Sequence, residues 1–253
     1  MVELIQLTPE VRVSWLGPPL SKGPLPALFY FALSASESLE LDPYNQPALY
    51  LADCPMRIFS IDLPAHGAGL NPVHALTVWA EEMGRGADPI SDCVKKADFA
   101  LDALLENGAI QSGKIGIMGL SRGGLIGAHL TARRNDIAAL LGFAPLTHLS
   151  FAKEFSEIKT LPAVQKLDLP NLVSSLSSEC IRFYVGNRDT RVSTRLCFEV
   201  VEALANSAFE SGQRSPPIEL ILSPSIGHMG HGTAKETFHA GARWMGEKLG
   251  VVR

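Results

Sequence analysis

A serine lies between glycines in the segment Gly119 to Gly124, with the sequence GLSRGG. This segment follows the apolar run 115–118 and precedes a helix-like stretch over 125–133. A sharp turn between a buried strand and a helix can lift a serine hydroxyl out of a sheet, and it needs glycine wherever a side chain would collide with nearby backbone. The pattern therefore predicts a nucleophile elbow with Ser121 as the nucleophile. Glycine and serine also gather in ordinary turns, so the rest of the chain has to support this interpretation.

The composition is that of a globular protein with a large core. The chain has 253 residues, of which 46% are hydrophobic, and its formal net charge is −4. These values predict a single domain over residues 1–253. The mild acidity and the lack of a basic cluster argue against nucleic acid as a partner, because affinity for nucleic acid comes largely from neutralising phosphates.

Cysteine and histidine spacing gives no sign of a metal site or a cofactor. The four cysteines are far apart and show no C-x-x-C spacing, and no H-E-x-x-H motif occurs. We therefore expect neither a metal nor another cofactor. No targeting segment and no long apolar stretch is visible, which favours a cytoplasmic protein that does not interact with a membrane. The sequence leaves the oligomeric state open.

Short apolar runs alternate with longer segments of helical periodicity. Predicted strands cover 2–7, 11–16, 27–33, 57–61, 115–118, 137–143, 181–185 and 218–222, the first two as edge strands. Predicted helices cover 47–54, 90–106, 125–133, 193–211 and a closing segment that begins near Thr233. This alternation predicts an α/β protein with a mostly parallel central sheet and helices on both faces. Functional side chains in such a sheet lie beyond the carboxyl ends of the strands.

The connection 146–178 is long for a simple crossover between two core strands. It would follow the sixth strand and lie over the carboxyl ends of the sheet. We expect either a small helical lid within the domain or a plain helix with irregular connections, and helical periodicity does not distinguish the two.

Candidate partners for Ser121 follow two later strands. Asp189 lies in the turn after 181–185, and His228 and His231 lie in the loop after 218–222. Strand-end residues in the order Ser, Asp, His fit a catalytic triad in which the imidazole takes the serine proton and the carboxylate orients the ring. We predict His228 as the base, because the preceding Gly227 gives the loop freedom to turn it inward. His231, at the approach to the closing helix, is the alternative.

Together these motifs resemble the alpha/beta-hydrolase superfamily. The resemblance spans roughly residues 25 to 250 and lies in the elbow at Ser121, the G-x-x-D turn at Asp189, the Gly227-His228 loop and the D-x-P-x-H-G segment over 62–67. Within the superfamily the chain looks most similar to dienelactone-hydrolase-like and prolyl-oligopeptidase-like esterases and peptidases. The resemblance implies the alpha/beta-hydrolase fold with a small helical insertion after the sixth strand. It also implies a serine hydrolase with the triad Ser121, Asp189 and His228.

An oxyanion hole for such an enzyme needs two backbone N–H donors. Arg122, the residue after the nucleophile, is expected to supply one, and Leu33 or Ser34, in the loop after the third strand, the other. The relatives commonly carry His-Gly where this chain has Ala32-Leu33. The Arg122 side chain has two possible roles, contact with a substrate carboxylate or an ordinary structural role as a surface ion pair or a contact at the helix N-terminus.

Three functions are consistent with these residues. The first is a carboxylesterase-like serine hydrolase that cleaves a small ester, lactone or thioester through an acyl-enzyme. The second is a peptidase or amidase with the same residues acting on a peptide-like substrate. The third is a binding protein that keeps the fold without turnover, and the absence of His-Gly after the third strand is the only feature that favours it.

Overall fold

In the computed structural model, which describes residues 2–67 and 69–252, eight strands form one sheet in the order β1-β2-β4-β3-β5-β6-β7-β8. Strands β3 to β8 run parallel to one another, and β2 runs antiparallel to both of its neighbours. The strands are β1 (Glu3–Thr8), β2 (Val11–Leu16), β3 (Leu25–Phe31), β4 (Arg57–Ser60), β5 (Ile110–Leu120), β6 (Ile137–Phe143), β7 (Ile181–Gly186) and β8 (Ile218–Ser223). The predicted α/β architecture with a mostly parallel sheet is confirmed.

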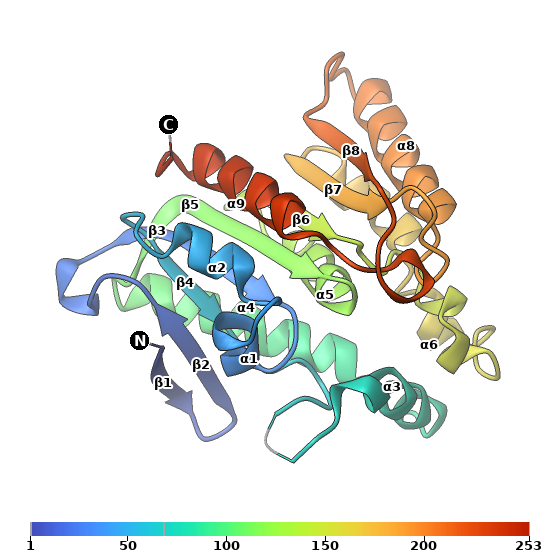
Figure 1. Ribbon diagram of the computed structural model, residues 1–253, viewed down its shortest axis with the longest axis horizontal. Coiled ribbons are helices and arrows are strands. Elements are labelled where there is room, and N and C mark those ends of the chain that lie inside the picture. Colours follow the sequence, from blue (N-terminus) through green and yellow to red (C-terminus); the bar gives the residue numbers. More distant parts are fainter. Residues whose placement is uncertain (1, 68, 253) are drawn as a thin grey trace.

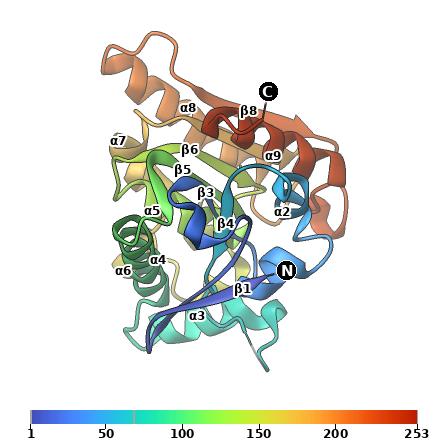
Figure 2. The ribbon, with the colours of Figure 1, turned by 90° about the vertical axis from the view of Figure 1, so that its left-hand side faces the viewer.

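Helices cover both faces of this sheet (Figures 1 and 2). They are α1 (Ala35–Glu40), α2 (Gln46–Leu51), α3 (Ala75–Gly84), α4 (Pro89–Glu106), α5 (Arg122–Thr131), α6 (Pro162–Gln165), α7 (Val173–Leu176), α8 (Thr194–Glu210) and α9 (Lys235–Leu249). Helices α1, α2 and α9 bury their apolar residues in one core cluster, and α3, α4, α5 and α8 bury theirs in the other. The central strands are therefore apolar on both faces, which explains their uninterrupted hydrophobic sequences.

Two expectations about the elements are wrong in detail. Strand β2 pairs with β1 on one side and β4 on the other, so it is not an edge strand. Helix α9 begins at Lys235 with Ala234 before it and not at a Thr233 cap. Helices α1 and α3 were not predicted, and α1 is a single short segment whose start is fixed by a capping box between Ser34 and Glu37.

The segment 146–178 consists of short helical turns. It contains three 3₁₀ turns, at Leu149–Phe151, Lys153–Phe155 and Leu169–Leu172, together with α6 and α7. Phe155 and Val164 are fully buried in the main core cluster, so the segment is packed onto the body of the protein. A mobile lid at this place stays a prediction. None of the described helices combines the length and the apolar composition needed to cross a membrane.

Candidate active site

Ser121 lies at the sharp turn between β5 and α5, as the glycine pattern predicts. Its backbone has φ 53° and ψ −115°, a conformation that is costly for a residue with a side chain. A Cβ at Gly119 would collide with the backbone of Gly123, and a Cβ at Gly123 would collide with the carbonyl of Phe31. The two glycines are therefore required for the turn to pack against β3.

Strand β6 and the residues after it hold this turn in place. The Ser121 N–H donates to the carbonyl of Phe143 at 2.8 Å, and the Leu146 N–H donates to the carbonyl of Ser121 at 2.9 Å. With both backbone groups bonded, the strained conformation is fixed by its surroundings and the hydroxyl is directed away from the sheet.

The hydroxyl of Ser121 is bonded to His231. Ser121 Oγ lies 2.9 Å from His231 Nε2, and His231 Nδ1 lies 2.7 Å from Asp189 Oδ2. An Nδ1–H that donates to the carboxylate leaves the lone pair of Nε2 free to accept the serine proton. The three side chains thus have the relative positions of a nucleophile, a general base and an orienting acid.

The prediction that His228 is the base is wrong by three residues. His228 is exposed and does not line the cavity around Ser121, whereas His231 does. Gly227 has a positive φ of 70°, so the loop turns there as expected, but this turn does not bring the following histidine to the serine.

The loop after β8 is attached to the loop after β7, and this attachment selects His231. The Thr190 N–H and hydroxyl both donate to the carbonyl of Met229, at 2.9 and 3.1 Å. Gly230, at φ 74°, packs so closely on the carbonyl of Arg188 that a side chain would collide there. These contacts position the next residue, His231, with its side chain against Asp189, and they leave the side chain of His228 exposed to solvent.

Asp189 is buried and fully bonded. Its side chain has no exposed surface, and Oδ1 accepts from the backbone N–H groups of Arg191 and Val192 at 2.9 and 3.1 Å. These two donors fix the carboxylate so that Oδ2 faces His231. The turn after β7 therefore places the Asp189 carboxylate against the imidazole of His231, the position that the predicted orienting acid would need.

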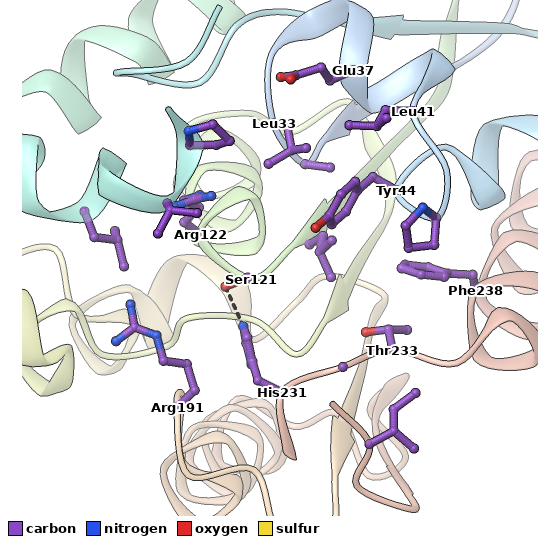
Figure 3. A pocket seen from close by; sticks show the side chains of 18 residues that line it. Leu33, Glu37, Leu41, Tyr44, Ser121, Arg122, Arg191, His231, Thr233 and Phe238 are labelled. Atoms are coloured by element: carbon purple, nitrogen blue, oxygen red, sulfur yellow. Dashed lines mark hydrogen bonds between the residues drawn. The ribbon is translucent and has the colours of Figure 1, made fainter. Parts of the chain in front are cut away.

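A cavity of about 660 Å³ opens beside Ser121. Figure 3 shows His231 reaching Ser121 from below, Arg122 and Arg191 on one side of the serine, and Tyr44 and Phe238 on the other. Glu37 of α1 and Thr233 also line the cavity, together with the apolar residues Leu41, Pro43, Pro72, Val73, Leu76 and Ile226. The cavity is thus large enough for a small organic substrate, with its basic side chains and its aromatic side chains on different sides.

The backbone donors of the expected oxyanion hole are only partly present. The Arg122 N–H, at the first position of α5, donates to none of the described residues and lies beside the serine. The Leu33 N–H donates to Ser38 Oγ at 3.0 Å, and the Ser34 N–H donates to the carboxylate of Glu37 at 3.2 Å. The prediction of Leu33 or Ser34 as the second donor is therefore not supported, because α1 uses both groups for its own capping.

Several cavity residues were not singled out from the sequence. Tyr44 extends into the cavity from the loop after α1, with its hydroxyl end turned toward the side of Ser121 (Figure 3). Arg191 lines the opposite side and forms a two-point ion pair with Glu154, at 2.9 and 3.0 Å. Arg191 lies two residues after Asp189, so it is close to the site because it belongs to the same turn after β7. No local pattern marks Tyr44 or Glu154.

No three histidine, cysteine, aspartate or glutamate side chains within residues 2–67 and 69–252 are grouped so as to hold a metal ion.

Comparison with known proteins identifies the fold. No family model and no curated protein matches the chain at a significant level. Among solved structures, an esterase of Pyrococcus furiosus, Pf2001, superposes with a TM-score of 0.64 at 19% identity, over 99% of this chain and 90% of its own. An acetyl xylan esterase from Paenibacillus sp. R4 gives a TM-score of 0.64 at 15% identity, over 98% of this chain and 88% of its own.

Larger peptidases share the same fold. A putative dipeptidyl aminopeptidase IV from Bacteroides ovatus gives a TM-score of 0.68 at 14% identity. This chain is covered to 99% but spans only 35% of that protein. The likeness to these esterases and peptidases shows that the chain has the alpha/beta-hydrolase fold, with the bonded Ser-His-Asp group at the carboxyl edge of its sheet.

Proposed function

We propose that this protein is a serine hydrolase that cleaves a small carboxylic ester through an acyl-enzyme. The observation that carries the proposal is the continuous chain of hydrogen bonds from Asp189 through His231 to Ser121, at 2.7 and 2.9 Å. This chain ends at the wall of a cavity large enough for a substrate.

In the proposed reaction Ser121 Oγ attacks the ester carbonyl while His231 Nε2 takes the hydroxyl proton. Asp189 stabilises the imidazolium that forms, and His231 then gives the proton to the departing alkoxide, which leaves as the alcohol. Water enters next and gives one proton to His231 as its oxygen attacks the acyl group. The acid is released, and the proton returns to Ser121.

The oxyanion formed in both steps needs two donors at the same place. We assign the Arg122 N–H as the first, because it has no acceptor among the described residues. We assign the Tyr44 hydroxyl as the second, because the Leu33 and Ser34 N–H groups are already bonded while Tyr44 extends into the cavity with no described side-chain partner.

Tyr44→Phe removes this hydroxyl and keeps the ring. We expect kcat for a good ester substrate to fall by about 10²- to 10³-fold with little change in KM, the usual effect of losing one oxyanion donor. Tyr50→Phe, a tyrosine exposed on α2 and outside the cavity, is the matched control. Equal kcat and KM for the two variants would show that the Tyr44 hydroxyl is not a donor to the oxyanion.

Fluorophosphonate labelling and an ester panel test the proposed function. We expect rapid labelling of the protein at Ser121, turnover of short p-nitrophenyl esters, and slower turnover as the acyl chain lengthens. The likeness to peptidases makes peptide p-nitroanilides the necessary second panel. Faster cleavage of the amides would favour a peptidase, and the absence of both labelling and turnover would favour a binding protein with this fold.

A further inference from the structure

Arg122 has an unusual position for an arginine. Its side chain is half-buried and lines the cavity beside Ser121. Among residues 2–67 and 69–252, no side chain or carbonyl accepts a hydrogen bond from its guanidinium and no carboxylate pairs with it. A guanidinium carries five N–H donors, so at Arg122 these donors are free to bind a ligand in the cavity.

Two other buried arginines show how this chain satisfies such a group. Arg57 has no exposed surface and donates to the backbone carbonyls of four residues, Pro18, Pro19, Gly23 and Ala109. Arg134 binds three carboxylates, those of Asp98, Asp102 and Asp136. These two arginines therefore have several acceptors each, and Arg122 differs from both.

The surroundings of Arg122 do not neutralise it. Glu154 is the carboxylate whose charge reaches it, but both oxygens of Glu154 are bonded to Arg191. Burial, together with the positive charge of Arg191, lowers the pKa of Arg122 to about 10. The group is still protonated near neutral pH, so the cavity holds a cation that lacks a counter-ion.

The position of this cation relative to the nucleophile suggests what binds it. Figure 3 shows the guanidinium of Arg122 on the same side of Ser121 as Arg191, while Tyr44 and Phe238 form the other side. Because Ser121 and Arg122 line the same cavity, a ligand that presents a reactive carbonyl to Ser121 can place a second group at Arg122. Planar carboxylates match the fork of a guanidinium, and Arg122 is the cation on this side that is free to bind one, because Arg191 is paired with Glu154.

We propose that the substrate is a small ester that carries a second, ionised carboxylate close to the scissile bond, and that Arg122 binds this carboxylate. This inference rests on the proposed hydrolase function. It adds a substrate class, with the apolar part of the substrate on the side of Tyr44 and Phe238.

Matched pairs of esters test the inference, because each pair differs only in the charged group. Monoethyl succinate and ethyl 4-methylpentanoate exchange a carboxylate for an isopropyl group on the acyl side. Acetoxyacetate and isobutyl acetate make the same exchange on the alcohol side. The measured quantity is the ratio of kcat/KM for the anionic ester to kcat/KM for the neutral ester of the same pair. We expect this ratio to exceed one for the wild type in one of the two pairs, and Arg122→Gln to lower it by roughly 10- to 100-fold.

Two further variants test whether a change in the ratio of anionic to neutral kcat/KM comes from the guanidinium of Arg122. Arg122→Lys keeps a charge without the planar fork, so it should give an intermediate ratio. Arg188→Gln removes an exposed arginine from the loop beside the site, outside the cavity, and should leave the ratio at its wild-type value. Because each variant is measured on both esters of a pair, any change common to both esters cancels.

Thermal melting supplies a readout without turnover. Replacing an arginine that stabilises the fold lowers the melting temperature, whereas we expect Arg122→Gln to melt close to the wild-type temperature, since the half-buried guanidinium is bonded to none of the described residues. We also expect millimolar succinate to raise the melting temperature of Ser121→Ala and to have no such effect on the Ser121→Ala/Arg122→Gln double variant.

The outcomes separate the two proposals. If fluorophosphonate labels Ser121 and neutral esters are hydrolysed, but neither ratio responds to Arg122→Gln, the carboxylate inference is overturned and the hydrolase function stands. If no ester is hydrolysed and Ser121 is not labelled, the proposed function fails and the substrate class fails with it. A lower melting temperature for Arg122→Gln would make Arg122 a structural residue.

Discussion

Ser121→Ala is expected to lower kcat for ester hydrolysis by about 10⁶-fold, the cost of losing the nucleophile of a triad. The substitution deletes one hydroxyl from a turn whose backbone is held by Phe143 and Leu146, so the fold should be preserved. Turnover of a p-nitrophenyl ester and fluorophosphonate labelling measure the effect, and circular dichroism checks the fold.

Ser225→Ala is the matched control. Ser225 lies in the loop after β8, and its hydroxyl accepts from the Arg188 N–H away from the cavity. Its loss should affect stability more than turnover. A folded Ser121→Ala protein that keeps more than about a tenth of the wild-type kcat would exclude a Ser121 acyl-enzyme.

The second large effect distinguishes two histidines in one loop. His231→Ala should abolish turnover and rapid fluorophosphonate labelling together, with a loss of kcat close to that of Ser121→Ala, because the serine loses its general base. His228→Ala should keep both near the wild-type level, since its side chain is exposed and outside the cavity. Rate constants for labelling and turnover of the two single variants give the comparison.

The reverse result would have a clear meaning. An inactive His228→Ala protein with an active His231→Ala protein would show that the loop after β8 rearranges when substrate binds. It would also contradict the role assigned to the 2.9 Å contact between His231 and Ser121.

The sheet was predictable because its strands are buried on both faces. The apolar run 137–143 coincides with β6, and the apolar residues of 181–185 and 218–222 fall within β7 and β8. Helix α3 could also have been found, because Leu76, Trp79 and Met83 lie at helical spacing and are buried. Helix α1 offers no such pattern, since its six residues are fixed mainly by local capping.

The site was predictable only where local sequence decides the geometry. Ser121 and Asp189 follow from turns at the ends of particular strands. The choice between His228 and His231 depends on a hydrogen bond between Thr190 and Met229, residues that are 39 positions apart. The sequence next to either histidine does not predict such a long-range contact. The glycine before His228 favoured the wrong histidine.

That contact between Thr190 and Met229 makes the acid and the base a single mechanical unit. Asp189 and His231 lie in the loops that follow the adjacent strands β7 and β8, and they are tied to each other by the backbone of these loops as well as by the imidazole–carboxylate bond. Ser121 stands on β5, with β6 in between. A shear of the sheet at β6 would therefore separate the nucleophile from an intact base–acid pair. In the proposed function, the alignment of Ser121 with His231 and Asp189 therefore depends on how β5 and β7 pack against β6.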